Sequence, residues 1–173
     1  YRRVGYEMAG GRYEITLHPR ELSLRERDLS VREAQSEDEA AIGRLFGRSV
    51  ARDYGPLDWA SPGWQQSIRV WREAHARYVV CAGKEIEGYI SYLIARRDRT
   101  LTVTDFFAST PRAARRLLTL LCDHREQIDQ AKWSGRPNEP MLLLLQQGTH
   151  QVSQAAAWML RIIDVPSALA QRG

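Results

Sequence analysis

Three arginines lie close together near the start of a predicted helix. Thr110 followed by Pro111 is a typical helix start, because Thr caps free amides and Pro fits the first helical position. Arg112, Arg115 and Arg116 follow within two turns. Guanidinium groups bind phosphate well, and a helix N-terminus attracts anions through its unpaired amides and its dipole. These arginines are therefore candidates for holding a phosphate group. The alternative is a solvated basic face without a ligand.

Other reactive side chains form no recognisable catalytic or metal-binding pattern. Cys122 and His124 are two residues apart on a predicted helix and so point to different sides, which is poor geometry for a thiolate–imidazole pair. Cys81 lies in a predicted strand, and both cysteines are expected to be small core residues. The histidines show no ligand spacing, so no metal site is expected. The remaining candidates are single carboxylates without a visible partner: Asp98, Asp105 and Asp123.

Hydrophobic periodicity predicts a mixed order of strands and helices around these residues. Ser36 and Glu39 form a capping-box pattern at the start of one helix, and Ser61-Pro62 marks the start of another. Residues 6–17 contain two strand-like pieces around a Gly-Gly pair, which indicates a hairpin or a bulge, and residues 130–140 are predicted as a loop. The predicted elements are strand 29–33, helix 36–52, a helix from 61, strands 78–82, 88–94 and 101–107, a helix from 110 and strand 141–145. Residues 155–164 fit either a strand or a helix, and we favour the strand. This order predicts an α/β (α+β) fold with a mixed, mostly antiparallel sheet and helices on both faces.

Composition limits the class of protein. The chain has 173 residues, of which 43% are hydrophobic, and this suffices for one well-buried core. No apolar run approaches the roughly 18 residues of a membrane-spanning helix. Only two cysteines are present and no signal-peptide pattern opens the chain, so we expect a cytoplasmic protein. The net charge of +4 favours anionic partners in general.

Three stretches, taken in order, resemble one family of proteins. The strand and helix order from Leu29 to Asp164 resembles the GNAT superfamily of acetyl-CoA-dependent N-acetyltransferases. The opening stretch "YRRVGY" is similar to the C-terminal signature of the same superfamily, and "WMLRIIDVPSALAQRG" is similar to the junction where a sterol-carrier-like domain begins. This layout resembles the enhanced intracellular survival (Eis) family of bacterial acetyltransferases.

The resemblance implies a division of the chain into three parts. Residues 1–28 would be the tail of a preceding GNAT domain and a linker, residues 29–164 a second, degenerate GNAT-like domain, and residues 165–173 the start of a sterol-carrier-like domain. The chain would then be an internal fragment of a longer acetyltransferase. It would act in domain positioning, in the substrate cleft and in homo-oligomer assembly.

The resemblance also suggests site residues. The family binds the pyrophosphate of acetyl-CoA with the motif Arg or Gln, two residues, Gly, one residue, Gly or Ala. Arg112 matches the first position of "RAARRL", but Arg115 and Leu117 occupy the two small positions. We therefore expect this helix to have lost the cofactor, which the missing first domain would hold. Tyr1 matches the tyrosine that protonates the departing thiolate, and is the expected general acid of the intact parent.

Two other functions remain open at this stage. The parent would acetylate an amine, and nothing in the sequence selects among aminoglycoside, lysine and polyamine. One alternative is a basic module that binds nucleic acid or another anion, although acidic residues are interleaved and no nucleic-acid motif is present. Another is that the chain binds acyl-CoA itself through its arginines. The basic residues concerned are Arg2, Arg3, Arg96, Arg97, Arg99, Arg112, Arg115 and Arg116.

Overall fold

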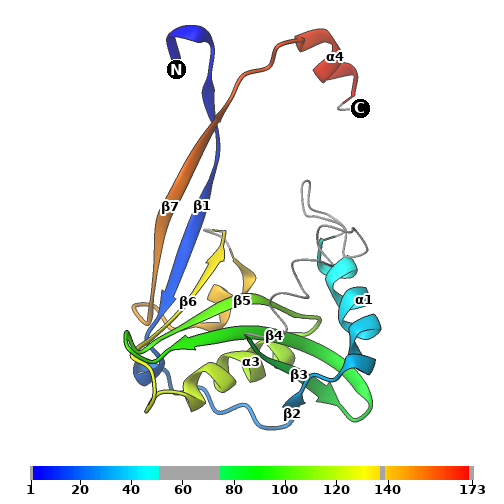
Figure 1. The fold of residues 1–173 in the computed structure, drawn as a ribbon, viewed down its shortest axis with the longest axis vertical. Helices are drawn as coiled ribbons and strands as arrows, with labels where there is room; N and C mark the ends of the chain where they lie inside the picture. The colour runs from blue at the N-terminus through cyan, green and yellow to red at the C-terminus, as the bar shows by residue number, and fades with distance from the viewer. Residues whose placement is uncertain (1, 51–74, 137–138, 172–173) are drawn as a thin grey trace.

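The computed structural model describes residues 2–50, 75–136 and 139–171 (Figure 1). These residues form one seven-stranded sheet in the order β2-β3-β4-β5-β6-β1-β7, in which every neighbouring pair is antiparallel except β5 and β6. The strands are β1 (Glu7–Leu17), β2 (Ser30–Glu33), β3 (Ala76–Ala82), β4 (Glu85–Ala95), β5 (Thr100–Ala108), β6 (Gln130–Gly135) and β7 (His150–Leu160). The described α-helices are α1 (Glu39–Val50), α3 (Pro111–Asp123) and α4 (Val165–Ala170).

The two larger helices cover opposite faces of the sheet. Side chains alternate between faces along a strand, so Val80 packs in the cluster that contains Leu117 of α3, while Val79 packs with Ile42 of α1. Val79, Val80, Ile42 and Leu117 are all fully buried. The predicted mixed, mostly antiparallel sheet with helices on both faces is therefore confirmed.

The parallel pair β5 and β6 separates part of the way along its length. Residues Thr100 to Val103 pair with Gln130 to Trp133, but β5 continues to Ala108 without β6 beside it. An 11-residue β4 supports β5 on its other side as far as Ala108. The sheet thus opens between β5 and β6, next to the N-terminus of α3.

The prediction for residues 130–145 was wrong. The strand beside β5 is Gln130–Gly135, which was expected to be a loop, and residues Pro140–Leu144 form the short 3-10 helix η4 instead of a buried strand. The Met-Leu run does not alternate in burial as a strand would, because Met141 is 7% exposed but Leu143 is 87% exposed. In β6, by contrast, only Ala131 and Trp133 point into the core. Two alternating buried residues are a weak strand signal, and the longer apolar run at 141–145 is a stronger one, so the strand was predicted there.

The predicted meander and the helix from Thr110 are confirmed, with β3, β4 and β5 at the expected positions and α3 starting at Pro111. The helix predicted from residue 36 is present as a 3-10 turn (η3, Ser36–Asp38) that leads into α1. Its capping box uses Gln35 and Asp38, one residue earlier than predicted. The helix predicted from Ser61 lies outside the described residues.

The strands β1 and β7 form a long two-stranded ribbon that extends away from the rest of the sheet (Figure 1). β1 is one strand and no hairpin, with a register shift between Met8 and Gly10, so the bulge interpretation of the Gly-Gly pair holds. The indole of Trp158 lies over Gly10, where a Cβ atom would come within 2.7 Å of Nε1. The strand predicted within residues 155–164 is confirmed as the second half of β7.

Candidate functional site

The N-terminus of α3 is closed by its own side chains. Thr110 is the cap, and its Oγ1 accepts a hydrogen bond of 3.2 Å from the amide of Ala113. Pro111 has no amide hydrogen to offer. Two of the three leading positions of the helix are therefore without a free donor for a bound anion.

A buried carboxylate from β4 lies at the same helix end. Glu87 is 6% exposed, and its Oε2 accepts hydrogen bonds from Thr110 Oγ1 at 2.6 Å and from Arg112 Nε at 3.1 Å. A second guanidinium nitrogen of Arg112 donates to Glu87 Oε1. The hydrogen bonds from Arg112 and then from Thr110 lower the pKa of Glu87, so the group is an anion at neutral pH. The α3 N-terminus thus already has an anionic partner that belongs to the protein.

We expect Glu87→Ala to lower the free energy of unfolding by about 1 to 2 kcal/mol at pH 7, since the half-buried hydroxyl of Thr110 loses its acceptor and Arg112 loses its partner. Because the folded-state pKa of Glu87 is lowered, its contribution is full above the unfolded-state pKa of about 4.3 and is lost as the pH falls through the folded-state value. Urea unfolding at pH 7 and pH 3 measures this difference. Glu85→Ala, which removes an exposed carboxylate of the same strand, is the control, and an equal loss in both variants would contradict the expectation.

The other two arginines of the predicted phosphate cluster point to different places. Arg116 is 7% exposed, and its Nε donates a 3.0 Å hydrogen bond to the carbonyl of Leu29, which ties α3 to the start of β2. Burial, and then the neighbouring Arg27, lower the pKa of Arg116. Arg115 is exposed and has no side-chain partner among the described residues. The structure therefore does not bring Arg112, Arg115 and Arg116 together around one anion.

The two positions that the family motif keeps small lie in the second turn of α3, since the helix begins at Pro111. Arg115 points to solvent and Leu117 is fully buried in the core. Neither side chain faces the helix N-terminus. The feature that opposes a pyrophosphate group is the Glu87 carboxylate together with the Thr110 cap and Pro111, so these residues do not fit the phosphates of acetyl-CoA.

An open cleft of about 980 Å³ lies where β5 and β6 separate. Its described walls come from β5, β6, β1, β7, η4, α1 and the first turn of α3. The lining includes aromatic and apolar side chains together with Asp105 on β5 and Trp133 on β6. The indole Nε1 of Trp133 is buried without a hydrogen-bond partner, and Trp133 is 3% exposed. Burial raises the pKa of Asp105 to about 7.

Sequence reasoning noted Asp105 only as a single carboxylate and missed Trp133, which lay in a predicted loop. The signal for Asp105 was a charged residue within the otherwise apolar and hydroxyl-bearing segment 100–108. A carboxylate inside a predicted strand is either paired or functional.

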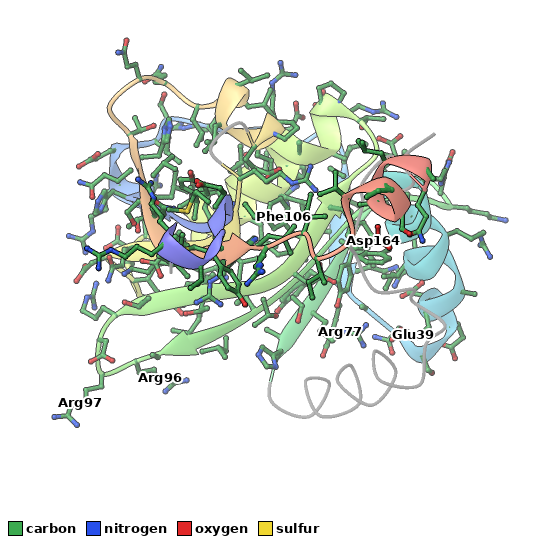
Figure 2. All side chains as sticks on the ribbon, turned by 90° about the horizontal axis from the view of Figure 1, so that it is seen from above. Glu39, Arg77, Arg96, Arg97, Phe106 and Asp164 are labelled. Carbon is green, nitrogen blue, oxygen red and sulfur yellow. The ribbon has the colours of Figure 1, made fainter. Side chains whose placement is uncertain are left out.

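The eight arginines of the nucleic-acid hypothesis do not form one basic face. Arg96 and Arg97 lie at the tip of the β4–β5 hairpin (Figure 2), whereas Arg112, Arg115 and Arg116 belong to α3. Arg99 pairs with Asp129 through a 3.0 Å contact, and Arg112 pairs with Glu87. Ion pairing and separation both weaken a continuous phosphate track.

The remaining candidates are structural or lie elsewhere. Cys81 and Cys122 are buried free thiols, as expected, and burial raises the pKa of Cys122 to about 11. His124 Nε2 shares a 2.7 Å hydrogen bond with the hydroxyl of Tyr92 and does not pair with Cys122. The described residues contain no cluster of ligands for a metal ion and no helix suited to cross a membrane. Tyr1, the predicted general acid, lies outside the described residues.

Comparison with solved structures finds the same fold in larger proteins. A GCN5-related N-acetyltransferase from Anabaena variabilis ATCC 29413 is 24% identical with a TM-score of 0.77, and the match covers 98% of this chain and 44% of that chain. A GCN5-related N-acetyltransferase from Kribbella flavida is 26% identical with a TM-score of 0.70, and the match covers 98% of this chain and 42% of that chain. Eis1 from Mycobacterium abscessus is 21% identical with a TM-score of 0.59, and the match covers 98% of this chain and 46% of that chain. This chain therefore spans less than half the length of each of these structures.

The sequence itself also matches a known family. A search of curated proteins found no match. The profile of the acetyltransferase (GNAT) domain matches residues 55–162, more than half of the 173 residues. That segment contains β3, β4, β5, α3 and β6, which form the opening in the sheet described above. The chain belongs to the GNAT acetyltransferase domain family.

Proposed function

We propose that this chain is the central, non-catalytic GNAT domain of an acetyl-CoA-dependent amine N-acetyltransferase of the Eis type. The main observation behind this proposal is the closed N-terminus of α3. Glu87 lies where an anion would bind, Thr110 caps the amide of Ala113, and Pro111 has no amide hydrogen. A pyrophosphate group at this position would face a buried carboxylate and would be repelled. The parent would then bind acetyl-CoA in another domain.

The relative lengths support a role within a larger polypeptide. Since this chain covers 42% to 46% of three GNAT-fold structures, a parent of similar length has room for the other domains. We propose that residues 1–28 follow a first GNAT domain, that residues 29–164 form the central one, and that residues 165–173 lead into a third. In this proposal Tyr1 serves the first domain as the general acid, and β1 fixes that domain to the central sheet.

Exposed apolar residues support a positioning role. Nine of the ten large apolar side chains that are exposed among the described residues lie on the ribbon and the segments that continue it. They are Val4, Met8, Val152, Trp158, Leu160, Ile162, Ile163, Val165 and Leu169. Such a concentration is typical of surfaces that another domain or subunit covers. The ribbon would carry contacts to the rest of the parent and to other copies in a cytoplasmic homo-oligomer.

Calorimetric titration with acetyl-CoA tests the proposal. At about 100 µM ligand, well above the roughly micromolar affinity of a working cofactor site, we expect no stoichiometric binding by this chain. Arg115 and other exposed arginines can still give a weak signal that disappears at higher salt. Stoichiometric binding that is insensitive to moderate salt would show that the central domain holds a cofactor.

A parallel titration with a DNA duplex tests the alternative of a basic binding module. A phosphate-tracking protein loses affinity steeply as salt rises. Because Arg99 and Arg112 are paired with acids, we expect only weak binding that is absent at 200 mM salt, an order-of-magnitude choice. Tight binding at that salt concentration would favour the alternative over an acetyltransferase part.

A further inference from the structure

The strand β7 forms one edge of the sheet along its full length. In the order β2-β3-β4-β5-β6-β1-β7 it is the last strand, and β1 is its only neighbour among the described residues. It has 11 residues, and all of them except His150 and Met159 are exposed. An edge strand presents a row of unpaired N–H and C=O groups, to which another strand can add.

The sequence of this edge favours strand addition. Residues 151–160, QVSQAAAWML, contain no charged residue and no proline. Natural edge strands are commonly short, or carry lysine or proline, because these features prevent pairing with another chain. Here Val152, Trp158 and Leu160 are apolar and between 38% and 60% exposed. This edge is therefore suited to pairing with a further strand.

The outer half of the ribbon lacks a third strand that the inner half has. β6 pairs with β1 only at residues 13–17, whereas β7 pairs with β1 over residues 7–17. Residues 7–12 of β1 and 156–160 of β7 thus continue as two strands alone among the described residues (Figure 1). A two-stranded ribbon is marginally stable in water without a third strand or a packing partner. The outer half therefore needs a partner.

The local symmetry of the ribbon indicates where that partner lies. Two antiparallel strands are related by a two-fold axis between them. This axis exchanges β1 and β7, and it carries the C-terminal half of β1 onto the C-terminal half of β7. Since β6 lies against the C-terminal half of β1, a second body built on the same plan would place its equivalent of β6 against residues 156–160.

The chain enters the ribbon at the end where this second body would lie. A short 3-10 helix precedes each strand of the ribbon, η4 before β7 and η1 (Arg2–Val4) before β1. η1 lies at the outer tip of the ribbon, away from the rest of the sheet (Figure 1). The stretch "YRRVGY" at this tip is similar to the end of a GNAT domain. A preceding GNAT domain would thus lie beside the outer half of β7.

We propose that residues 156–160 of β7 pair with a strand of the preceding GNAT domain, the strand that corresponds to β6 in that domain. The sheets of the two domains are then continuous through the ribbon, in the order β6, β1, β7 and the incoming strand. The inference rests on the proposed function, which supplies the preceding domain, and it adds the strand on which that domain docks.

Amide hydrogen exchange of this chain and of the parent polypeptide tests the proposal. In this chain alone, the amides of residues 156–160 that point away from β1 should exchange quickly. In the parent, every second amide of this segment should exchange at least about 100-fold more slowly, because an added strand bonds only the outward N–H groups. The outward amides of residues 7–12 should keep their rates. Protection of those β1 amides instead, or unchanged rates in residues 156–160, overturns the proposal.

Proline substitution tests whether backbone pairing is responsible. Of the neighbours Ala156 and Ala157, one N–H points towards β1 and the other away, and exchange in this chain identifies the outward one. Proline at the outward position removes no hydrogen bond of the ribbon, so the urea midpoint of this chain should stay unchanged. In the parent it should remove most of the protection gained in residues 156–160. Serine at the same position keeps the N–H and should keep the protection.

Protection that persists in the proline variant overturns strand addition. If that variant does not fold, the comparison of exchange rates between the unaltered proteins still decides.

Two further results separate the possible failures. Protection of residues 156–160 that rises with the concentration of this chain alone would show that a second copy occupies the edge, and would overturn the proposal. Unprotected residues 156–160 in a parent that acetylates an amine would overturn only the strand addition. A parent without a GNAT domain before Tyr1 would overturn the proposed function as well.

Discussion

Replacement of Leu117 by glycine is expected to lower the free energy of unfolding by about 3 to 6 kcal/mol. Leu117 is fully buried in the cluster that joins α3 to the sheet. Removal of a buried leucine side chain costs about 2 to 5 kcal/mol through lost burial and the cavity that remains. Glycine within a helix adds about 1 kcal/mol. Urea unfolding followed by circular dichroism measures the total.

The control for this prediction is Arg115→Gly, two residues earlier on the exposed side of the same helix. It should lose only about 1 kcal/mol, the helix-propensity difference. Similar losses in the two variants would contradict the burial of Leu117. The expected contrast also means that the small residues of the family motif cannot be restored at both positions, because one of them now supports the core.

Much of the fold could be predicted from the sequence, because its signals are local. The cap at Thr110 and the alternating β3–β5 meander depend on neighbouring residues, and both are present as expected. The strand β6 could not be predicted, because its place is fixed by pairing with β5, about 30 residues away, and with β1, more than 110 residues away. Periodicity within six residues cannot report such distant partners.

The candidate site also depends on contacts between residues that are distant in the sequence. The prediction that α3 has lost the phosphate site was based on Arg115 and Leu117, which do not face the helix end. Glu87, the residue that closes it, comes from β4, 23 residues before Thr110. Its role depends on the sheet bringing β4 beside the start of α3. Likewise, Asp105 and Trp133 both border the opening that forms where β5 and β6 separate after Val103.

The second large effect concerns the carboxylate of Asp105, whose pKa burial raises from 3.8 to about 7. Between these values the unfolded chain binds fewer protons than the folded one, so the stability falls as the pH rises from about 4 to about 7. The other charged or titratable groups that face Asp105 are Arg77 on β3 and Tyr89 on β4, with Glu39 of α1 bound to Arg77. None of these is altered by a change at position 105.

Asp105→Asn should therefore leave the free energy of unfolding nearly unchanged at pH 4 and raise it by about 2 to 4 kcal/mol at pH 8, with partial exposure favouring the lower value. Parallel urea unfolding of both proteins at the two pH values measures this. Asp98→Asn, on the exposed β4–β5 turn, should stay within about 0.5 kcal/mol throughout. A variant that is less stable than the parent chain at pH 8 would mean that Asp105 has a stabilising partner. The expected gain instead identifies a carboxylate whose burial weakens the fold at neutral and higher pH.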